Sequence, residues 1–240
     1  MIRILLNILP PVNSQLNVPD EQIHHIVNVR RVKAGDEVEC IDYDNNFCPG
    51  IIEEISKDEV IIRITGEIIQ KEKLPHIILY SALLPEKKID WIIQKCTEIG
   101  VTEFTPVLTE FCTAKFHPKN SEKKLARWNK IAEEAAKQCG GSPMKINHPE
   151  TISKIFENNA KIKIICEKNG EKLEKITQKR EKLDENRKIA VLIGPEGGFS
   201  KNELVSAENY GWTTVSFHQN ILRTETAAVV CCSLIQHNIK

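Results

Sequence analysis

The sequence has no cysteine spacing that indicates a metal site or a disulfide framework, although it contains eight cysteines. No two of them have the C-x-x-C spacing, and Cys231-Cys232 is the only adjacent pair. Clustered spacings of that kind mark zinc sites and thiol redox motifs. We therefore interpret the cysteines as buried free thiols in a reducing compartment and predict no metal site.

The sequence also lacks net charge and long apolar runs. Lysine plus arginine and aspartate plus glutamate both total 33, so no global positive field attracts nucleic acid, and any RNA contact has to be local. The apolar stretch Ile4–Leu9 is interrupted by Asn7 and ends at Pro10-Pro11. It is too short for a signal segment or a membrane span, so we expect a cytoplasmic protein with no membrane segment.

Phosphate-binding motifs are missing from the most distinctive stretch, Ile193–Ser200 (IGPEGGFS). Phe199 stands where a P-loop needs lysine, and the pattern G-x-G-x-x-G is absent, so the ligand should lack phosphate. The stretch follows an apolar run, and parallel sheets bind ligands at the carboxyl ends of their strands. Its glycines permit backbone contact with a flat ligand, but a tight strand-to-helix turn explains them equally well. Ser200 and Glu203 form the pattern of a capping box at a helix start.

The N-terminal part resembles a small β-barrel in its pattern of short β-rich runs separated by turns. These runs are 38–41, 50 onward and 60–64. One helix is predicted to start at Asp20 and to carry Arg31. The polar segment 70–73 predicts a linker, so we expect one domain at residues 1–72 and a second at 73–240.

Strands and helices alternate after residue 74. Apolar residues recur at helical spacing from Ile89 to Ile99, where Gly100 ends the helix, and again from Leu125 to Cys139. The predicted strands are 77–84, 104–108, 162–166, 188–193 and 213–217. The charged segment 171–188 fits either a helix or a loop. This order predicts an α/β fold with a mainly parallel sheet.

A second distinctive stretch is Ile221–Ala228 (ILRTETAA). Thr224 is suited to cap a helix, and Glu225 in the first turn suits the helix dipole. Arg223 has no such structural explanation, because a buried arginine beside apolar Leu222 needs an anion or carbonyl groups around it. The helix that follows is apolar on nearly all sides, so it requires burial either in the subunit interior or in a dimer interface.

Together, GPEGGFS and ILRTETAA resemble the ribosomal RNA small subunit methyltransferase E family of the SPOUT class. Further matches cover nearly the whole chain and include Gln94-Lys95, Glu98–Val101 and Arg127-Trp128. The resemblance implies a PUA-like RNA-binding β-barrel followed by an α/β domain with a deep trefoil knot and a mainly parallel sheet. It also implies a homodimer that uses S-adenosylmethionine to methylate N3 of one uridine in 16S rRNA of the 30S subunit.

The expected site residues fall into three groups: the first follows from the resemblance, the second from the chemistry of the reaction, and the third from positive charge. The expected cofactor-binding residues are Cys166, Glu167, Ile193, Gly194, Pro195, Gly197, Gly198, Ile221, Leu222, Arg223, Thr224, Thr226 and Ala227. The expected catalytic residues are Arg223, Glu225 and Glu196, with a glutamate as the base and arginine stabilising charge on the uracil. The expected RNA-binding residues are Arg30, Arg31, Lys33, Lys88, Lys115 and Arg127, although lysine-rich helix faces are also commonly just solvated.

Several basic positions of the family are changed in this chain. Pro85, Phe111, Gly141 and Asn220 replace basic residues, and Lys88 replaces an arginine. Because phosphate contacts supply much of the affinity for nucleic acid, these changes leave two rival functions open. One is a SPOUT enzyme for another rRNA or tRNA base, and the other is a non-catalytic RNA-binding paralogue.

Overall fold

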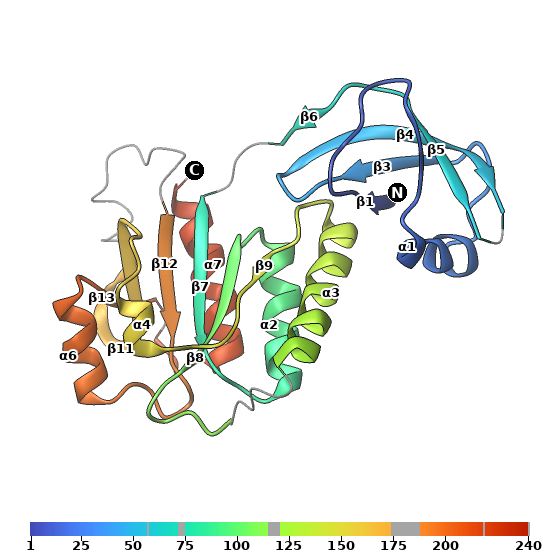
Figure 1. Ribbon diagram of the computed structural model, residues 1–240. Coiled ribbons are helices and arrows are strands. Elements are labelled where there is room, and N and C mark those ends of the chain that lie inside the picture. The colour runs from blue at the N-terminus through green and yellow to red at the C-terminus, as the bar shows by residue number, and fades with distance from the viewer. Residues whose placement is uncertain (57, 72–74, 115–120, 174–187, 218, 240) are drawn as a thin grey trace. The chain divides into compact units, whose positions relative to one another are not determined.

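The computed structural model describes residues 1–56, 58–71, 75–114, 121–173, 188–217 and 219–239. The chain forms two compact units (Figure 1). The first comprises Met1–Lys73 and Ala136–Ser142, and the second comprises Leu74–Ala135 and Pro143–Lys240. Across the described ranges, no helix combines the length and the hydropathy that a membrane span needs.

The first unit is built on a six-stranded sheet with the order β1-β3-β4-β5-β2, and β6 pairs with β4. Its elements are β1 (Ile2–Leu5), β2 (Gln15–Asn17), α1 (Asp20–His24), η1 (His25–Val29), β3 (Glu37–Ile41), β4 (Asn46–Ile55), β5 (Val60–Ile64) and β6 (Ile69–Gln70). β1 pairs with β3 in parallel, and the other pairs are antiparallel. Since the order of the described strands starts at β1 and ends at β2, closure into a barrel stays a prediction.

The predicted helix of this unit starts at Asp20, directly after Pro19. Buried Gln22 fixes it to β1, because its amide accepts from Leu5 N at 3.1 Å and donates to Leu5 O at 2.7 Å. The π-helical turn η1 continues α1 to Val29. The prediction that this helix carries Arg31 is wrong: Arg31 lies beyond the helix end, with φ at 53°.

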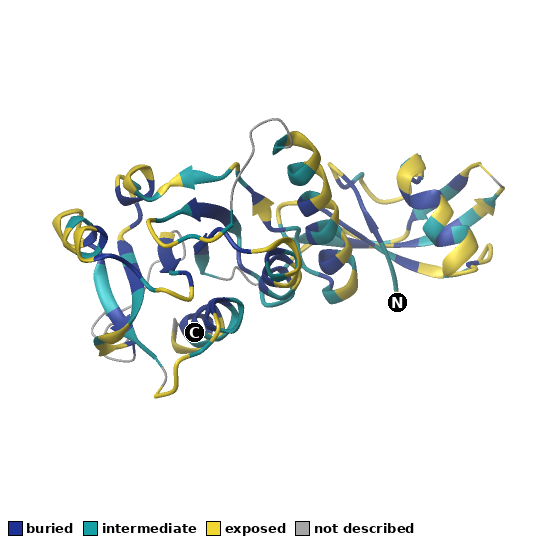
Figure 2. Ribbon diagram, turned by 90° about the horizontal axis from the view of Figure 1, so that it is seen from below, coloured by how far each residue is buried: buried dark blue, intermediate teal, exposed yellow. Residues whose placement is uncertain are grey.

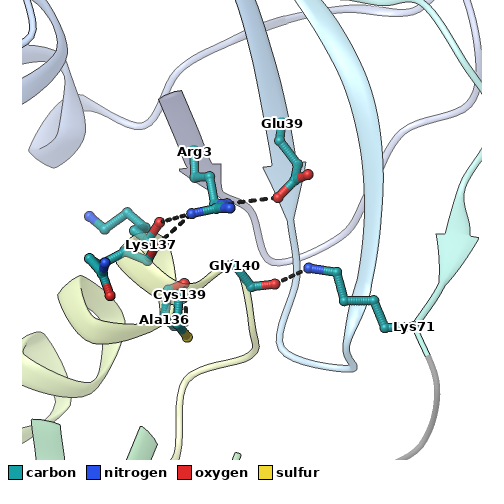
Figure 3. Close-up of polar contacts among 8 residues, drawn as sticks. Arg3, Glu39, Lys71, Ala136, Lys137, Cys139 and Gly140 are labelled. Atoms are coloured by element: carbon teal, nitrogen blue, oxygen red, sulfur yellow. Dashed lines mark hydrogen bonds and ion pairs between the residues drawn. The ribbon is translucent and has the colours of Figure 1, made fainter. Parts of the chain in front are cut away.

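The last turn of α3 (Ser121–Cys139) belongs to the first unit and is held there by two basic side chains (Figure 3). The Arg3 guanidinium donates to Lys137 O at 3.0 Å and to Gln138 O at 2.6 Å, and also pairs with Glu39. Lys71 donates to the carbonyl of Gly140. The last carbonyls of an α-helix generally lack donors from the helix itself, so these two cations donate hydrogen bonds where the helix cannot.

The second unit contains a seven-stranded sheet with the order β10-β8-β7-β12-β11-β13, and β9 pairs with β8. Its strands are β7 (His76–Ala82), β8 (Glu103–Leu108), β9 (Lys145–Ile146), β10 (Glu150–Thr151), β11 (Ile162–Lys172), β12 (Lys188–Ile193) and β13 (Thr213–Ser216). All pairings between these strands are parallel, which confirms the predicted sheet type. Of the charged segment 171–188, residues 174–187 lie outside the described part of the chain.

Helices cover both faces of this sheet, so its central strands are buried on both sides. The helices are α2 (Glu86–Glu98), the first part of α3, α4 (Ile152–Phe156), α6 (Lys201–Asn209) and α7 (Thr224–Ile239). Along β7, Ile77 and Leu79 face the core that contains α2, α3 and α7, whereas Ile78 and Tyr80 face the core of α4 and α6. Figure 2 shows the buried positions gathered on the strands and the exposed ones on the outer sides of helices.

The helical periodicity of the sequence correctly locates α2 and α3. Ile89, Ile92, Ile93 and Cys96 are fully buried along one side of α2, and Gly100 ends the helix with φ at 80°. Trp128 and Ala132 form the buried side of α3. A left-handed residue directly after a helix favours glycine because a side chain would be strained there.

Replacing Arg3 by methionine should loosen the last turn of α3, because the stem remains but the donors to Lys137 O and Gln138 O are lost. Hydrogen bonds from charged groups contribute about 1.5–3 kcal/mol, so amide exchange around 137–140 should accelerate by at least about tenfold. Hydrogen exchange read by mass spectrometry measures this. Arg30→Met is the matched control at an exposed position, and equal exchange in both variants would contradict the assignment.

The stability of the second unit should fall in acid through Glu103 at the start of β8. The His76 hydrogen bond at 3.0 Å, with help from Asn147 and Lys145, lowers the pKa of Glu103 from 4.5 to about 2 against the effect of burial. A lowered folded-state pKa stabilises above about pH 4.5, and this contribution is lost as the pH falls towards 2. Thermal unfolding of wild type and Glu103→Gln should therefore differ at neutral pH and converge at low pH. A constant difference would contradict this.

Candidate active site

The pairing of two neighbouring strands brings two of the predicted segments together, although β11 continues to Lys172 and the prediction that this strand ends at residue 166 is wrong. Cys166 of β11 lies opposite Ile193, the last residue of β12, and also opposite Val215 of β13. Cys166-Glu167 and the loop after β12 therefore lie side by side. This is the edge where parallel sheets bind ligands.

Each glycine of the loop after β12 has a structural reason. A side chain at Gly194 would meet the Phe199 ring at 2.9 Å, and one at Gly197 would meet Phe111 Cβ at 3.2 Å. Gly198 has φ at 72° and donates to Pro195 O at 2.9 Å, which closes a tight turn. The glycines thus serve the turn itself, and they also leave the backbone at Gly197 exposed and that at Gly198 half-buried.

The predicted capping box at the start of α6 is confirmed. Glu203 N donates to Ser200 Oγ at 3.3 Å, and Ser200 N donates to Glu203 Oε2 at 2.8 Å. The other carboxylate oxygen of Glu203 accepts from Glu110 N at 2.8 Å. Buried Glu203 therefore also fixes the loop after β8 next to the glycine loop.

The start of α7 is joined to the glycine loop by a hydrogen bond. The buried Thr224 hydroxyl donates to Gly194 O at 2.9 Å. Thr224 is therefore not the helix cap that its residue type suggests. The cap position belongs to Arg223, whose carbonyl accepts from Ala227 N at 2.8 Å.

The remaining residues predicted from ILRTETAA flank Thr224, which makes this hydrogen bond. Ile221 is 80% exposed, Leu222 packs against the apolar core, and Thr226 is half-buried beside buried Ala227. A second contact ties α7 to β11, since Cys166 Sγ lies 3.5 Å from Cys231 Sγ. That contact and burial raise the pKa of Cys231, which keeps it a neutral thiol.

Lys88 of α2 holds both predicted catalytic glutamates. Its ammonium forms an ion pair with Glu196 in the glycine loop and lies 3.5 Å from Glu225 Oε2 at the start of α7. The bond to Lys88 lowers the pKa of Glu196, and it raises the pKa of Lys88. Glu225 Oε2 is buried and accepts no hydrogen bond from any described residue. A buried acceptor without a donor is unusual enough to indicate a function.

Arg223 is exposed, which corrects the expectation that it is buried between apolar neighbours. Its guanidinium forms no ion pair within the described ranges of the chain. An exposed arginine at this position remains free to meet an incoming ligand.

The predicted RNA-binding residues fall into three groups. Arg30, Arg31 and Lys33 are exposed in the first unit, around the end of η1. Lys88 is engaged with the glutamates, and Arg127 forms ion pairs with Asp90 and Glu86 of α2. Lys115 lies outside the described residues.

The cysteines of the structure are free thiols, and five are buried: Cys40, Cys48, Cys96, Cys231 and Cys232. Within the residues that the structure describes, no group of three or more His, Cys, Asp or Glu side chains is arranged to hold a metal ion.

Two family models match the chain in separate regions. The model described as an RNA methyltransferase domain matches residues 70–236, and the RNA methyltransferase PUA domain matches residues 18–65. The first therefore covers well over half of the chain and includes every residue of the glycine loop and the start of α7.

Curated relatives and a solved structure resemble the whole chain. Ribosomal RNA small subunit methyltransferase E 2 of Borreliella burgdorferi is 31% identical over 88% of this chain and 87% of its own length. Ribosomal RNA small subunit methyltransferase E of Buchnera aphidicola is 32% identical over 90% of this chain and 85% of its own. The crystal structure of a ribosomal RNA small subunit methyltransferase E from Neisseria gonorrhoeae bound to S-adenosyl methionine is similar, with a TM-score of 0.88 at 25% identity. The match covers 99% of this chain and 97% of that one.

Replacing Thr224 by valine should detach the start of α7 from the glycine loop, because the shape is kept but the donor to Gly194 O is lost. A lost hydrogen bond of this kind costs about 1 kcal/mol, so thermal unfolding should shift down by about 2–4 °C. Thr224→Ser keeps the donor and is the matched control. Equal unfolding temperatures for the serine and valine variants would contradict this role.

Proposed function

The chain belongs to the ribosomal RNA small subunit methyltransferase E family, and from this membership we propose that it methylates small-subunit rRNA with S-adenosylmethionine as methyl donor. The specific reaction that we propose is transfer to N3 of one uridine in the decoding region of 16S rRNA, within the 30S subunit. The observation that carries this reaction is the Glu225 carboxylate, whose buried Oε2 has no hydrogen-bond partner among the described residues and lies 3.5 Å from the Lys88 ammonium.

We assign the methyl donor to three segments, Cys166-Glu167, Ile193–Gly198 and Ile221–Ala227. Their proximity supports this, through the β11–β12 pairing and the bond from Thr224 to Gly194. The half-buried backbone at Gly198, which faces Glu167, fits a flat adenine, and Phe199 takes the place of the lysine that a phosphate would need. When bound, S-adenosylmethionine supplies an electrophilic methyl group on a positively charged sulfur.

Glu225 is the base that we propose for the acceptor. Uracil N3 carries a proton that must leave when the N3–methyl bond forms and the methyl–sulfur bond breaks. The Glu225 carboxylate can accept this N–H hydrogen bond and take the proton, since its contact with the Lys88 ammonium, at 3.5 Å, is longer than a normal hydrogen bond. Glu196 is the weaker candidate, since its ion pair with Lys88 lowers its pKa and so its basicity.

Arg223 is the group that we propose to stabilise the uracil. As N3 loses its proton, negative charge spreads onto the two carbonyl oxygens of the base. The exposed guanidinium of Arg223, two residues before Glu225 in the chain, can donate hydrogen bonds to these oxygens. The backbone of Arg223 also belongs to a segment assigned to S-adenosylmethionine. This residue would therefore contact both substrates.

RNA docking, the knot and the dimer complete the proposal. We propose that residues 1–72 form a PUA-like domain that binds RNA, with exposed Arg30, Arg31 and Lys33 as phosphate contacts. Residues 73–240 form the SPOUT domain, with the deep trefoil knot of that class. Part of α7 remains available for a second subunit, because Val229 and Leu234 are only partly buried.

Methyl transfer to 30S subunits that lack the modification tests the function. Labelled S-adenosylmethionine should yield N3-methyluridine at a single position, identified by mass spectrometry of the nucleosides and of RNA fragments. A different methylated base would assign another RNA target. Donor binding without any transfer to 30S subunits would contradict the proposed substrate.

Glu225→Gln should lower kcat by about 100-fold or more, because the amide keeps the shape but cannot take the proton. The Kd for S-adenosylmethionine should remain unchanged. Glu196→Gln is the matched control and should stay within about tenfold of wild type, since only the ion pair with Lys88 is lost. The reverse order of the two defects would assign the base to Glu196.

A further inference from the structure

The glycine loop has a second side, which the donor assignment does not use. A side chain at Gly198 would point towards Glu167, with Oε2 at 3.6 Å, whereas one at Gly197 would point towards Phe111 at 3.2 Å. The order of strands explains this, because β12 has β11 on one side and β7 and then β8 on the other. The methyl donor is assigned to the β11 side, which leaves the β8 side for the second substrate.

Phe111 lies on this free side with a large part of its ring exposed. It follows β8, and 44% of its surface is accessible. Gly197 is the residue beneath it, and any side chain there would lie against Phe111 Cβ and Cγ. The glycine therefore leaves one part of the ring uncovered next to the loop that carries Glu196.

The turn that presents Phe111 is fixed on both sides of the ring. Before it, Glu110 N donates to buried Glu203 at 2.8 Å. After it, Cys112 N donates to Thr109 O at 3.2 Å, and Cys112 Sγ lies 3.2 Å from the Thr109 hydroxyl. An exposed apolar ring on a rigid support loses little conformational freedom when a ligand binds.

We propose that Phe111 is a stacking platform for an unpaired base of the RNA substrate, an inference that rests on the proposed function. A phenyl ring has no charge for a phosphate and no hydrogen-bonding group, but it offers a flat face to any base. Stacking on the β8 side places RNA beside Glu196, Lys88 and Glu225, which form one ion-paired group. Phe111 then orients the RNA on one side of the loop while the donor occupies the other.

Substitutions that separate ring stacking from apolar bulk test this inference. Phe111→Leu should raise the KM for 30S subunits by about tenfold and leave the Kd for S-adenosylmethionine unchanged. Phe111→Tyr, which keeps an aromatic ring, should retain the wild-type KM. Tyr210→Ala removes another exposed ring, at the C-terminal end of α6, and serves as the control. A wild-type KM for Phe111→Leu would overturn the inference.

A direct probe uses Phe111→Trp and a short single-stranded oligouridine. Indole fluorescence at position 111 should be quenched when the oligouridine is added, beyond any change in wild type, and this readout does not require turnover. Quenching by S-adenosylmethionine alone would place the ring in the S-adenosylmethionine site. A smaller oligomer for Phe111→Leu than for wild type would place the ring in a subunit interface. Both results contradict the inference, whereas inactivity of wild type on 30S subunits contradicts only the proposed function.

Discussion

The hydrogen bond from the Thr224 hydroxyl to Gly194 O joins the two most distinctive parts of the sequence. One partner follows β12, and the other begins α7. The parallel pairing of Cys166 with Ile193 adds a third segment at the same edge of the sheet. Packing against neighbouring rings and the geometry of the turn require the loop glycines, so we infer that the loop keeps its shape before a ligand binds. The backbone groups are therefore positioned in advance for binding.

Charge in the site is organised around one cation. Lys88 pairs with Glu196 and lies near Glu225, so three separate elements meet at a single ammonium group. The two glutamates differ in their surroundings, because Glu196 is hydrogen-bonded to Lys88, which lowers its pKa, whereas Glu225 Oε2 is buried, lies 3.5 Å from Lys88 and has no hydrogen-bond partner among the described residues. Two carboxylates in one site can thereby have separate roles, which is a common basis for acid–base chemistry.

Local features of the fold could be predicted from the sequence, because their causes lie within a few residues. The capping box of Ser200 and Glu203 and the Gly100 end of α2 are of this kind. The two-residue strands β9 and β10 are too short for any periodicity to indicate them.

Contacts between distant residues could not be predicted in the same way. Lys88 and Glu196 are 108 positions apart, and Arg3 and Gln138 are 135 positions apart. Such pairs depend on the whole fold, and the sequence pattern of Lys88 indicated only a basic surface position. The exposure of Arg223 was missed because its apolar neighbours suggested burial.

The assignment of S-adenosylmethionine to these three segments is tested most directly by hydrogen exchange with and without the cofactor. Protection should appear at residues 166–167, 193–198 and 221–227, where binding would shield backbone amides from water. The amide of Phe111 and those of 20–33 should exchange as before. Protection confined to other segments, or binding with no change in these three, would contradict the account.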